Sequence, residues 1–72
     1  MKEKKPRVGD LVRIDKEYPN TEAAGQLAMI VRTLGIECVV QPIGPRLSAF
    51  MQRHEGPWWF ARTYLEVISE SR

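Results

Sequence analysis

The stretch from Gly25 to Gly44, GQLAMIVRTLGIECVVQPIG, most constrains the fold of this chain. It contains two runs rich in Ile, Val, Leu, Met and Cys, which meet at Gly35. Gly25 bounds the stretch on one side, and the segment from Pro42 to Pro45 bounds it on the other. Apolar runs with glycine and proline at their ends are typical of paired strands. The stretch therefore predicts a β-hairpin.

The register of this hairpin depends on its turn, and the sequence is compatible with two turns. A two-residue turn of Leu34 and Gly35 would place Arg32 opposite Glu37, and one face would then carry Leu27, Met29, Val31, Ile36, Cys38 and Val40. A three-residue turn ending at Gly35 would instead give a face made of Ala28, Ile30, Ile36, Cys38 and Val40. The second turn is favoured because its last residue needs a positive φ, which glycine adopts readily.

Both registers lead to the same prediction for the second strand of the hairpin. In both, Ile36, Cys38 and Val40 point inward and Val39 points outward. The outer face of the hairpin is then unusually apolar, and such a face is normally covered by the same curled sheet or by another molecule. We therefore expect that homo-oligomers could form through the outer face of residues 25–44.

The rest of the chain predicts three further strands, a long loop and an insertion. The segments are a strand over Val8–Ile14, a loop over Asp15–Ala24, a helix or ordered loop over Pro45–Gly56, a strand over Pro57–Ala61, a tight turn over Arg62–Tyr64 and a last strand over Leu65–Ile68. The helical alternative for the insertion has Pro45 at its first position and an apolar stripe at i, i+3, i+4 and i+7, namely Leu47, Phe50, Met51 and His54.

The aromatic run PWWFA is expected to divide its side chains between the two faces of its strand. Alternation places Trp58 and Phe60 on one face and Trp59 on the other. One tryptophan must therefore leave the core, and an exposed tryptophan is a favoured anchor at interfaces.

The order of these segments resembles that of small SH3-like barrel proteins. The residues that carry the resemblance are VGDLVRI, then a glycine opening an apolar strand, then WWF ahead of LEVI. Proteins of this kind include uncharacterised bacterial and bacteriophage proteins and, more distantly, KOW-type modules and photosynthetic accessory subunits. The resemblance implies an all-β, five-stranded SH3-like barrel over residues 8–68 with a short helical insertion over 45–56, flanked by a flexible basic tail (1–7) and a polar tail (69–72).

The composition excludes several kinds of site. With 72 residues, one Cys and one His, the chain has room for a single domain and has neither an internal disulfide nor a zinc cluster. Calcium-loop and phosphate-loop motifs are absent, and Cys38 lies in mid-strand on the inward face, where a thiol is usually a small hydrophobe. We therefore expect no catalytic residues, no metal and no cofactor. We also expect no signal peptide or membrane span, and hence a cytoplasmic protein, in the host cytoplasm or virion if it is phage-encoded.

The candidate binding residues are aromatic and basic. SH3-like barrels commonly bind through aromatic residues between the long loop and the last strands, so the resemblance implies a partner-binding set of Trp58, Trp59, Tyr64, Tyr18, Arg46, Arg53 and Arg62. The basic residues of the N-terminal tail are candidates for contact with nucleic acid, namely Lys2, Lys4, Lys5 and Arg7.

These features predict a non-enzymatic binding module, an accessory protein of a bacteriophage or bacterium that docks on a larger protein through exposed aromatic residues. One alternative is a nucleic-acid-binding module of the KOW or Tudor kind that uses the basic tail and the arginines, although a net charge of +2 is small for that role. The other alternative is a structural, self-assembling subunit.

Overall fold

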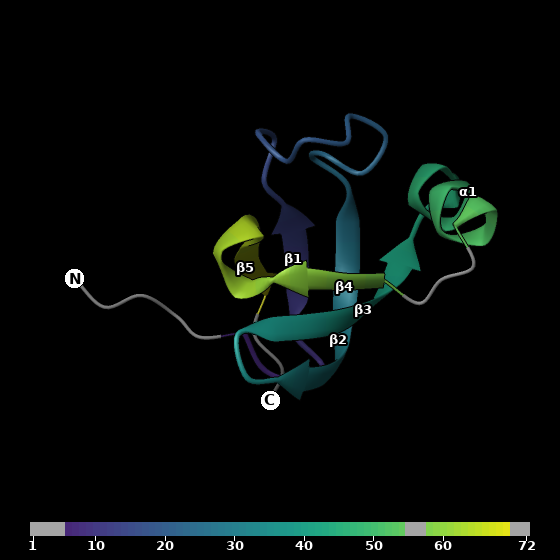
Figure 1. The fold of residues 1–72 in the computed structure, drawn as a ribbon. Helices are drawn as coiled ribbons and strands as arrows, with labels where there is room; N and C mark the ends of the chain where they lie inside the picture. Colours follow the sequence, from purple (N-terminus) through teal and green to yellow (C-terminus); the bar gives the residue numbers. More distant parts are fainter. Residues whose placement is uncertain (1–5, 55–57, 70–72) are drawn as a thin grey trace.

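The computed structural model describes residues 6–54 and 58–69 of the chain (Figure 1). The elements in chain order are β1 (Leu11–Ile14), β2 (Leu27–Leu34), β3 (Glu37–Ile43), α1 (Pro45–Arg53), β4 (Trp58–Ala61), the 3-10 helix η1 (Arg62–Tyr64) and β5 (Leu65–Ser69). The predicted succession of five strands along the chain, the long loop after β1 and the short turn before β5 are confirmed. Of the two alternatives for the insertion the structure has the helix. The predicted helix end at Gly56 and strand start at Pro57 lie outside the described residues.

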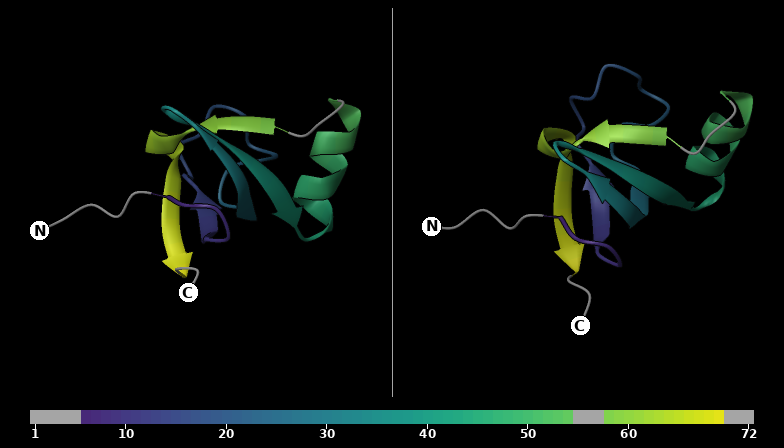
Figure 2. Two further views of the ribbon diagram at one scale, coloured as in Figure 1. Left: turned by 90° about the horizontal axis from the view of Figure 1, so that it is seen from below. Right: turned by 60° about the horizontal axis from the view of Figure 1, so that its bottom comes forward.

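The five strands form one antiparallel sheet in the order β4-β3-β2-β1-β5. The sheet is open and strongly curved, so that β3 and β4 cross in front of β1 and β2 (Figures 1 and 2). The prediction of a mostly β protein with five strands and one helical insertion is therefore confirmed.

The first strand is shorter than predicted because the chain turns before it. Val8 and Gly9 form a turn in which Gly9 has a φ of 93°, and β1 begins only at Leu11. The Gly9 amide donates a hydrogen bond to the Ile30 carbonyl at 2.7 Å, and the buried Asp10 carboxylate accepts one from the Arg7 amide at 2.9 Å. These bonds fix the approach of the chain to the sheet.

Both predicted registers of the β2–β3 hairpin are wrong. Leu34 pairs with Glu37, so the turn consists of Gly35 and Ile36, with Gly35 at its first position and a φ of 63°. Ile36 was expected to point inward but is 71% exposed, because it occupies the second position of the turn rather than a strand. The physical reason is that glycine supplies the positive φ that a two-residue hairpin turn needs at its first position.

A bulge restores the expected inner face beyond this turn. The pairing shifts between Ile30 and Arg32, which leaves Val31 as the extra residue, and Ile30 then lies opposite Val40. The inward positions of Cys38 and Val40 are confirmed, with Ala28 and Ile30 on the same face. Val39 lies outside this core cluster, as predicted, yet it is only 7% exposed.

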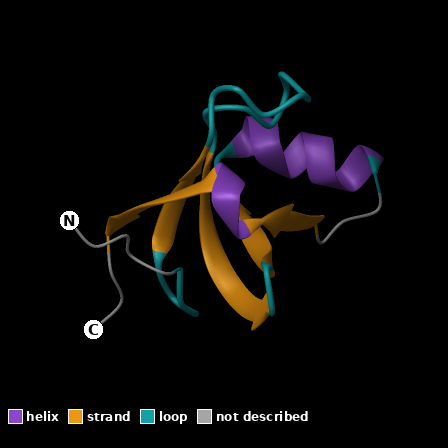
Figure 3. Cartoon of the chain, turned by 60° about the vertical axis from the view of Figure 1, so that its left-hand side comes forward, coloured by secondary structure: helices purple, strands orange, loops and turns teal. Residues whose placement is uncertain are grey.

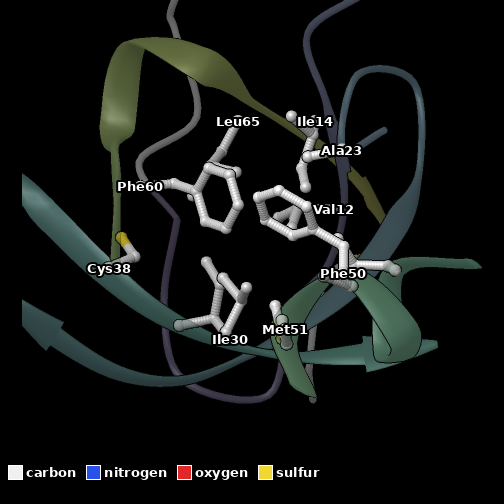
Figure 4. Packing of buried hydrophobic residues seen from close by; sticks show 12 residues of the cluster. Val12, Ile14, Ala23, Ile30, Cys38, Phe50, Met51, Phe60 and Leu65 are labelled. Carbon is white, nitrogen blue, oxygen red and sulfur yellow. The ribbon is translucent and has the colours of Figure 1, made fainter. Parts of the chain in front are cut away.

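Helix α1 belongs to the core rather than to the surface. It lies beside the curved sheet and below the long loop (Figure 3), and its buried residues are Leu47, Phe50 and Met51. Phe50 from α1 and Phe60 from β4 meet at the centre of the cluster, with Val12, Ile14 and Ile30 around them (Figure 4). The predicted apolar stripe of the helix is thus confirmed for its first three members. His54 ends the helix and is exposed, and the centroids of the His54 and Phe50 rings are 4.7 Å apart.

Candidate functional site

The long loop after β1 is built to present Tyr18. The Asp15 side chain accepts a hydrogen bond from the Glu17 amide at 2.8 Å, and the Asp15 carbonyl accepts one from the Tyr18 amide at 3.0 Å. This turn, in which a short acidic side chain bonds its own backbone two residues on, reverses the chain immediately after the strand. The tyrosine ring is therefore directed back toward the sheet.

The ring of Tyr18 joins two other aromatic rings. It packs against Phe60 of β4 with ring centroids 5.1 Å apart and against Tyr64 of η1 with ring centroids 5.0 Å apart. The two tyrosine rings meet edge to face, at an interplanar angle of 88°, which is a favoured geometry for aromatic pairs. We call Tyr18 and Tyr64 the tyrosine pair.

Backbone hydrogen bonding holds the tyrosine pair in place, and both of its members remain half-buried. The Asp15 amide donates a hydrogen bond to the Tyr64 carbonyl at 2.7 Å, so the loop and η1 are tied together beside the rings. Burial raises the pKa of the Tyr18 phenol, and the nearby Tyr64 raises it further. The neutral phenol is therefore the stable form over the physiological pH range.

Arg62 is the first residue of η1, the 3-10 helix that ends at Tyr64. Its backbone amide donates a hydrogen bond to the Ile36 carbonyl at 2.7 Å, which connects η1 to the β2–β3 turn. Burial raises the pKa of the Cys38 thiol, and the positive charge of Arg62 opposes that shift. Cys38 is fully buried and behaves as a small apolar residue, as expected from the sequence.

Trp59 lies on the other side of β4 from the tyrosine pair. Phe60 is buried in the core beneath Tyr18, whereas Trp59, its neighbour in the strand, pairs with Val39 and is 50% exposed. The predicted alternation is confirmed for Trp59 and Phe60, which lie on opposite faces of β4, but Trp59 and the tyrosine pair do not form a single surface. The backbone of Trp58 pairs with Val40 in β4. The prediction for the Trp58 side chain lies outside the described residues.

The remaining basic candidates are distant from the tyrosine pair or already have partners. Arg46 and Arg53 lie on α1, at the opposite end of β4 from η1 (Figure 1). Arg46 is exposed, and Arg53 makes an ion pair with Glu22 of the long loop. Arg7 is exposed while its backbone is bonded to Asp10. The candidates Lys2, Lys4 and Lys5 lie outside the described residues.

Sequence reasoning missed an open groove of about 370 Å³ between α1 and the hairpin. Its lining combines apolar and uncharged polar side chains, namely Val31, Val40, Gln41, Pro42, Ser48, Met51 and Gln52. The only sequence signal for it is that Ser48 and Gln52 are four residues apart, hence on one face of the helix. The described residues of its lining offer apolar surface and the uncharged hydrogen-bonding groups of Gln41, Ser48 and Gln52.

The described residues hold neither a cluster of metal-ligating side chains nor a membrane-spanning helix. Residues 6–54 and 58–69 contain no group of three or more His, Cys, Asp or Glu side chains placed to hold a metal ion. Within the same residues, no helix is long and apolar enough to cross a membrane. The tyrosine pair offers aromatic contact area and two hydroxyl groups.

Comparisons with protein-family models, with curated proteins and with solved structures found no match to this chain.

Proposed function

We propose that this chain is a non-enzymatic binding module that docks on a larger protein through the tyrosine pair and the adjoining Arg62. The observation that carries the proposal is the edge-to-face contact of Tyr18 and Tyr64, half-buried rings from two segments far apart in the chain. Tyrosine supplies a large, amphipathic contact area with few rotatable bonds, and it is enriched where proteins bind one another.

The order of the two rings before binding supports this role. Tyr18 is held by the Asp15 turn and by Phe60, and Tyr64 is held by the hydrogen bond from the Asp15 amide. Side chains that are already fixed lose little conformational entropy on association, so more of their contact energy appears as affinity. A pair of rings fixed in this way is suited to a partner with an apolar segment that packs on the rings and with polar groups that form hydrogen bonds with the two phenol hydroxyls.

We further propose that the fold is an SH3-like barrel. The strand order β4-β3-β2-β1-β5, the long loop after β1 and the 3-10 helix between β4 and β5 support this proposal. On the sequence resemblance we also propose that the chain is a bacteriophage or bacterial accessory protein that acts in the cytoplasm or, for a phage, in the virion.

Protein docking ranks ahead of nucleic-acid binding in this proposal because two of the exposed arginines already have acidic neighbours. Arg53 is paired with Glu22, and Arg13 lies 4.0 Å from a Glu66 carboxylate oxygen. A phosphate backbone would have to compete with these carboxylates for the guanidinium groups. Binding to nucleic acid would also weaken steeply with added salt, whereas docking through aromatic surface would persist.

The test begins with the immobilised 72-residue chain, used to capture its partner from the native cell extract at low and at high salt. The captured protein is then purified and its dissociation constant measured with the unmodified chain and with a Tyr64→Ala variant. Loss of an interface hot spot costs about 2 kcal/mol or more, so we expect Tyr64→Ala to bind about thirtyfold more weakly.

Two further variants make this measurement specific. Thr63→Ala changes an exposed neighbour on the same 3-10 helix and should bind as the unmodified chain does. Tyr64→Phe keeps the ring and removes only the hydroxyl, so it should retain most of the affinity. Equal affinities of Tyr64→Ala and Thr63→Ala, with both variants folded by circular dichroism, would refute the proposed site.

A further inference from the structure

We propose that two copies of this chain associate through the outer face of the β2–β3–β4 sheet, related by a two-fold axis. This outer face consists of the cross-strand pairs Arg32–Val39 and Leu34–Glu37, together with Trp59 beside Val39 and Ile36 at the turn. It lies on the opposite side of β4 from the tyrosine pair. The inference is therefore independent of the proposed partner site.

The apolar part of the outer face has the character of an interface centre. Trp59 is 50% exposed and Ile36 is 71% exposed, and both lie close to the same end of the hairpin. Val39, which lies between Trp59 of β4 and Arg32 of β2, is only 7% exposed, since these cross-strand neighbours already shield it from water. A tryptophan beside a shielded apolar residue, with charged groups at the margin, matches the anatomy of protein interfaces.

The charges of the outer face identify a second copy as the occupant. Arg32 and Glu37 are both exposed, and neither makes an ion pair in the part of the chain that the structure describes. One exposed cation and one exposed anion make the face complementary to itself. In a two-fold interface each residue meets its counterpart reciprocally, so a self-complementary face is what such an interface requires.

The strand register gives this arrangement a definite geometry. Arg32, Val39, Glu37 and Leu34 occupy the four corners of a rectangle on the sheet surface, with Arg32 and Glu37 at opposite corners. Consider a two-fold axis that is parallel to the sheet and runs along the diagonal from Val39 to Leu34. This axis would place Arg32 of each copy over Glu37 of the other. Val39 and Leu34 would then contact their own counterparts, and two equivalent ion pairs would flank an apolar centre.

The overall charge also permits association. The net charge of the chain is only +2, so two copies repel one another weakly. Pairing through the outer face would cover the exposed side of Trp59 and Ile36, which otherwise remain in water.

The test is the mass of the full chain in solution, measured by sedimentation equilibrium from micromolar to millimolar concentration. We expect a concentration-dependent rise from 8.3 kDa to twice that mass. Arg32→Glu and Glu37→Arg should each place like charges together and raise the dimer dissociation constant at least about tenfold. The double variant carrying both changes should recover the dissociation constant of the unmodified chain, because the two ion pairs are re-formed with reversed sign.

A matched control is Arg46→Glu, which makes the same charge change at an exposed site on α1 and should leave the dimer intact. The proposal is overturned by a mass of 8.3 kDa at every concentration. It is equally overturned by single charge variants that dimerise as the unmodified chain does, or by a folded double variant that fails to recover dimerisation. Circular dichroism establishes that each variant is folded before its mass is interpreted.

Discussion

Replacing Leu47 by alanine tests whether the helical insertion is part of the core. Leu47 is fully buried, and together with Phe50 and Met51 it anchors α1 to the sheet. Truncating a buried leucine to alanine lowers the free energy of unfolding by about 2–5 kcal/mol. We expect about 3 kcal/mol for Leu47→Ala, because α1 lies at an open side of the sheet and can shift partly into the space left by the side chain. A chain of 72 residues has a total free energy of unfolding of about 4–11 kcal/mol, so this single change removes a large part of it.

The assay is urea unfolding followed by far-ultraviolet circular dichroism. A small domain has a denaturant slope of about 1 kcal/mol per molar urea, so the midpoint should fall by about 3 M with an unchanged slope. The control is Gln52→Ala, which truncates an exposed residue of the same helix and should change the free energy of unfolding by less than about 0.5 kcal/mol. Equal midpoints for Leu47→Ala and Gln52→Ala would refute the packing of α1 described above.

Three further predictions concern the turn, the long loop and a surface ion pair. Gly35→Ala should lower the free energy of unfolding by about 1–2 kcal/mol in the same urea assay. The cost comes from backbone strain alone, because φ is +63° at Gly35 and nothing lies within 4 Å of an added Cβ. An unchanged midpoint would contradict the positive φ assigned to Gly35 in the turn. The folded-state pKa of Tyr18 lies above its ordinary value of 10.0, so the contribution of the neutral phenol to stability should be fully present below pH 10.0 and be lost as the pH rises further. The free energy of unfolding of a Tyr18→Phe variant should therefore fall less steeply with rising alkaline pH than that of the unmodified chain. Equally steep falls would contradict the assignment. A double-mutant cycle on Glu22 and Arg53, whose side chains are 48% and 52% exposed, should give a coupling below about 1 kcal/mol that shrinks with salt, and a larger, salt-insensitive value would contradict an exposed pair.

The strands and the helix could be predicted because their signals are local. Apolar runs bounded by glycine and proline identify β2 and β3, and the stripe of Leu47, Phe50 and Met51 identifies α1. The register of the hairpin could not be predicted, because Gly35 suits either the first or the last position of a turn. The hydrophobicity of Ile36 favoured burial, but the turn geometry places it in solvent at 71% exposure.

The inner face of the hairpin was predicted better than its register because a bulge in β2 compensates for the unexpected position of the turn. With Val31 as an extra residue, Ile30 and Val40 face one another although the turn lies elsewhere than expected. A bulge depends on the pairing of two strands and on the packing around them, so the sequence of one strand does not reveal it.

Tyr18, Tyr64 and Arg62 could be named as binding candidates from the sequence, but the contact between the two tyrosine rings could not be predicted. Alternation along β4 correctly placed Trp59 and Phe60 on opposite faces. That Tyr18 packs on Phe60 follows only from the three-dimensional path of the loop. The contact of Tyr18 with Tyr64 depends on the Asp15 turn and on the hydrogen bond between Asp15 and Tyr64, which are tertiary features. The spacing of Tyr18 and Tyr64 along the chain therefore could not predict their contact.

The most direct test of the proposed binding surface is nuclear magnetic resonance of the isotopically labelled full chain during titration with its purified partner. We expect the largest changes in amide chemical shift to cluster at Tyr18, Arg62, Thr63 and Tyr64, with small changes on α1 and on the outer face. Changes confined to α1, or to Trp59 and its neighbours on the outer face, with the amides of the tyrosine pair unmoved, would contradict the account.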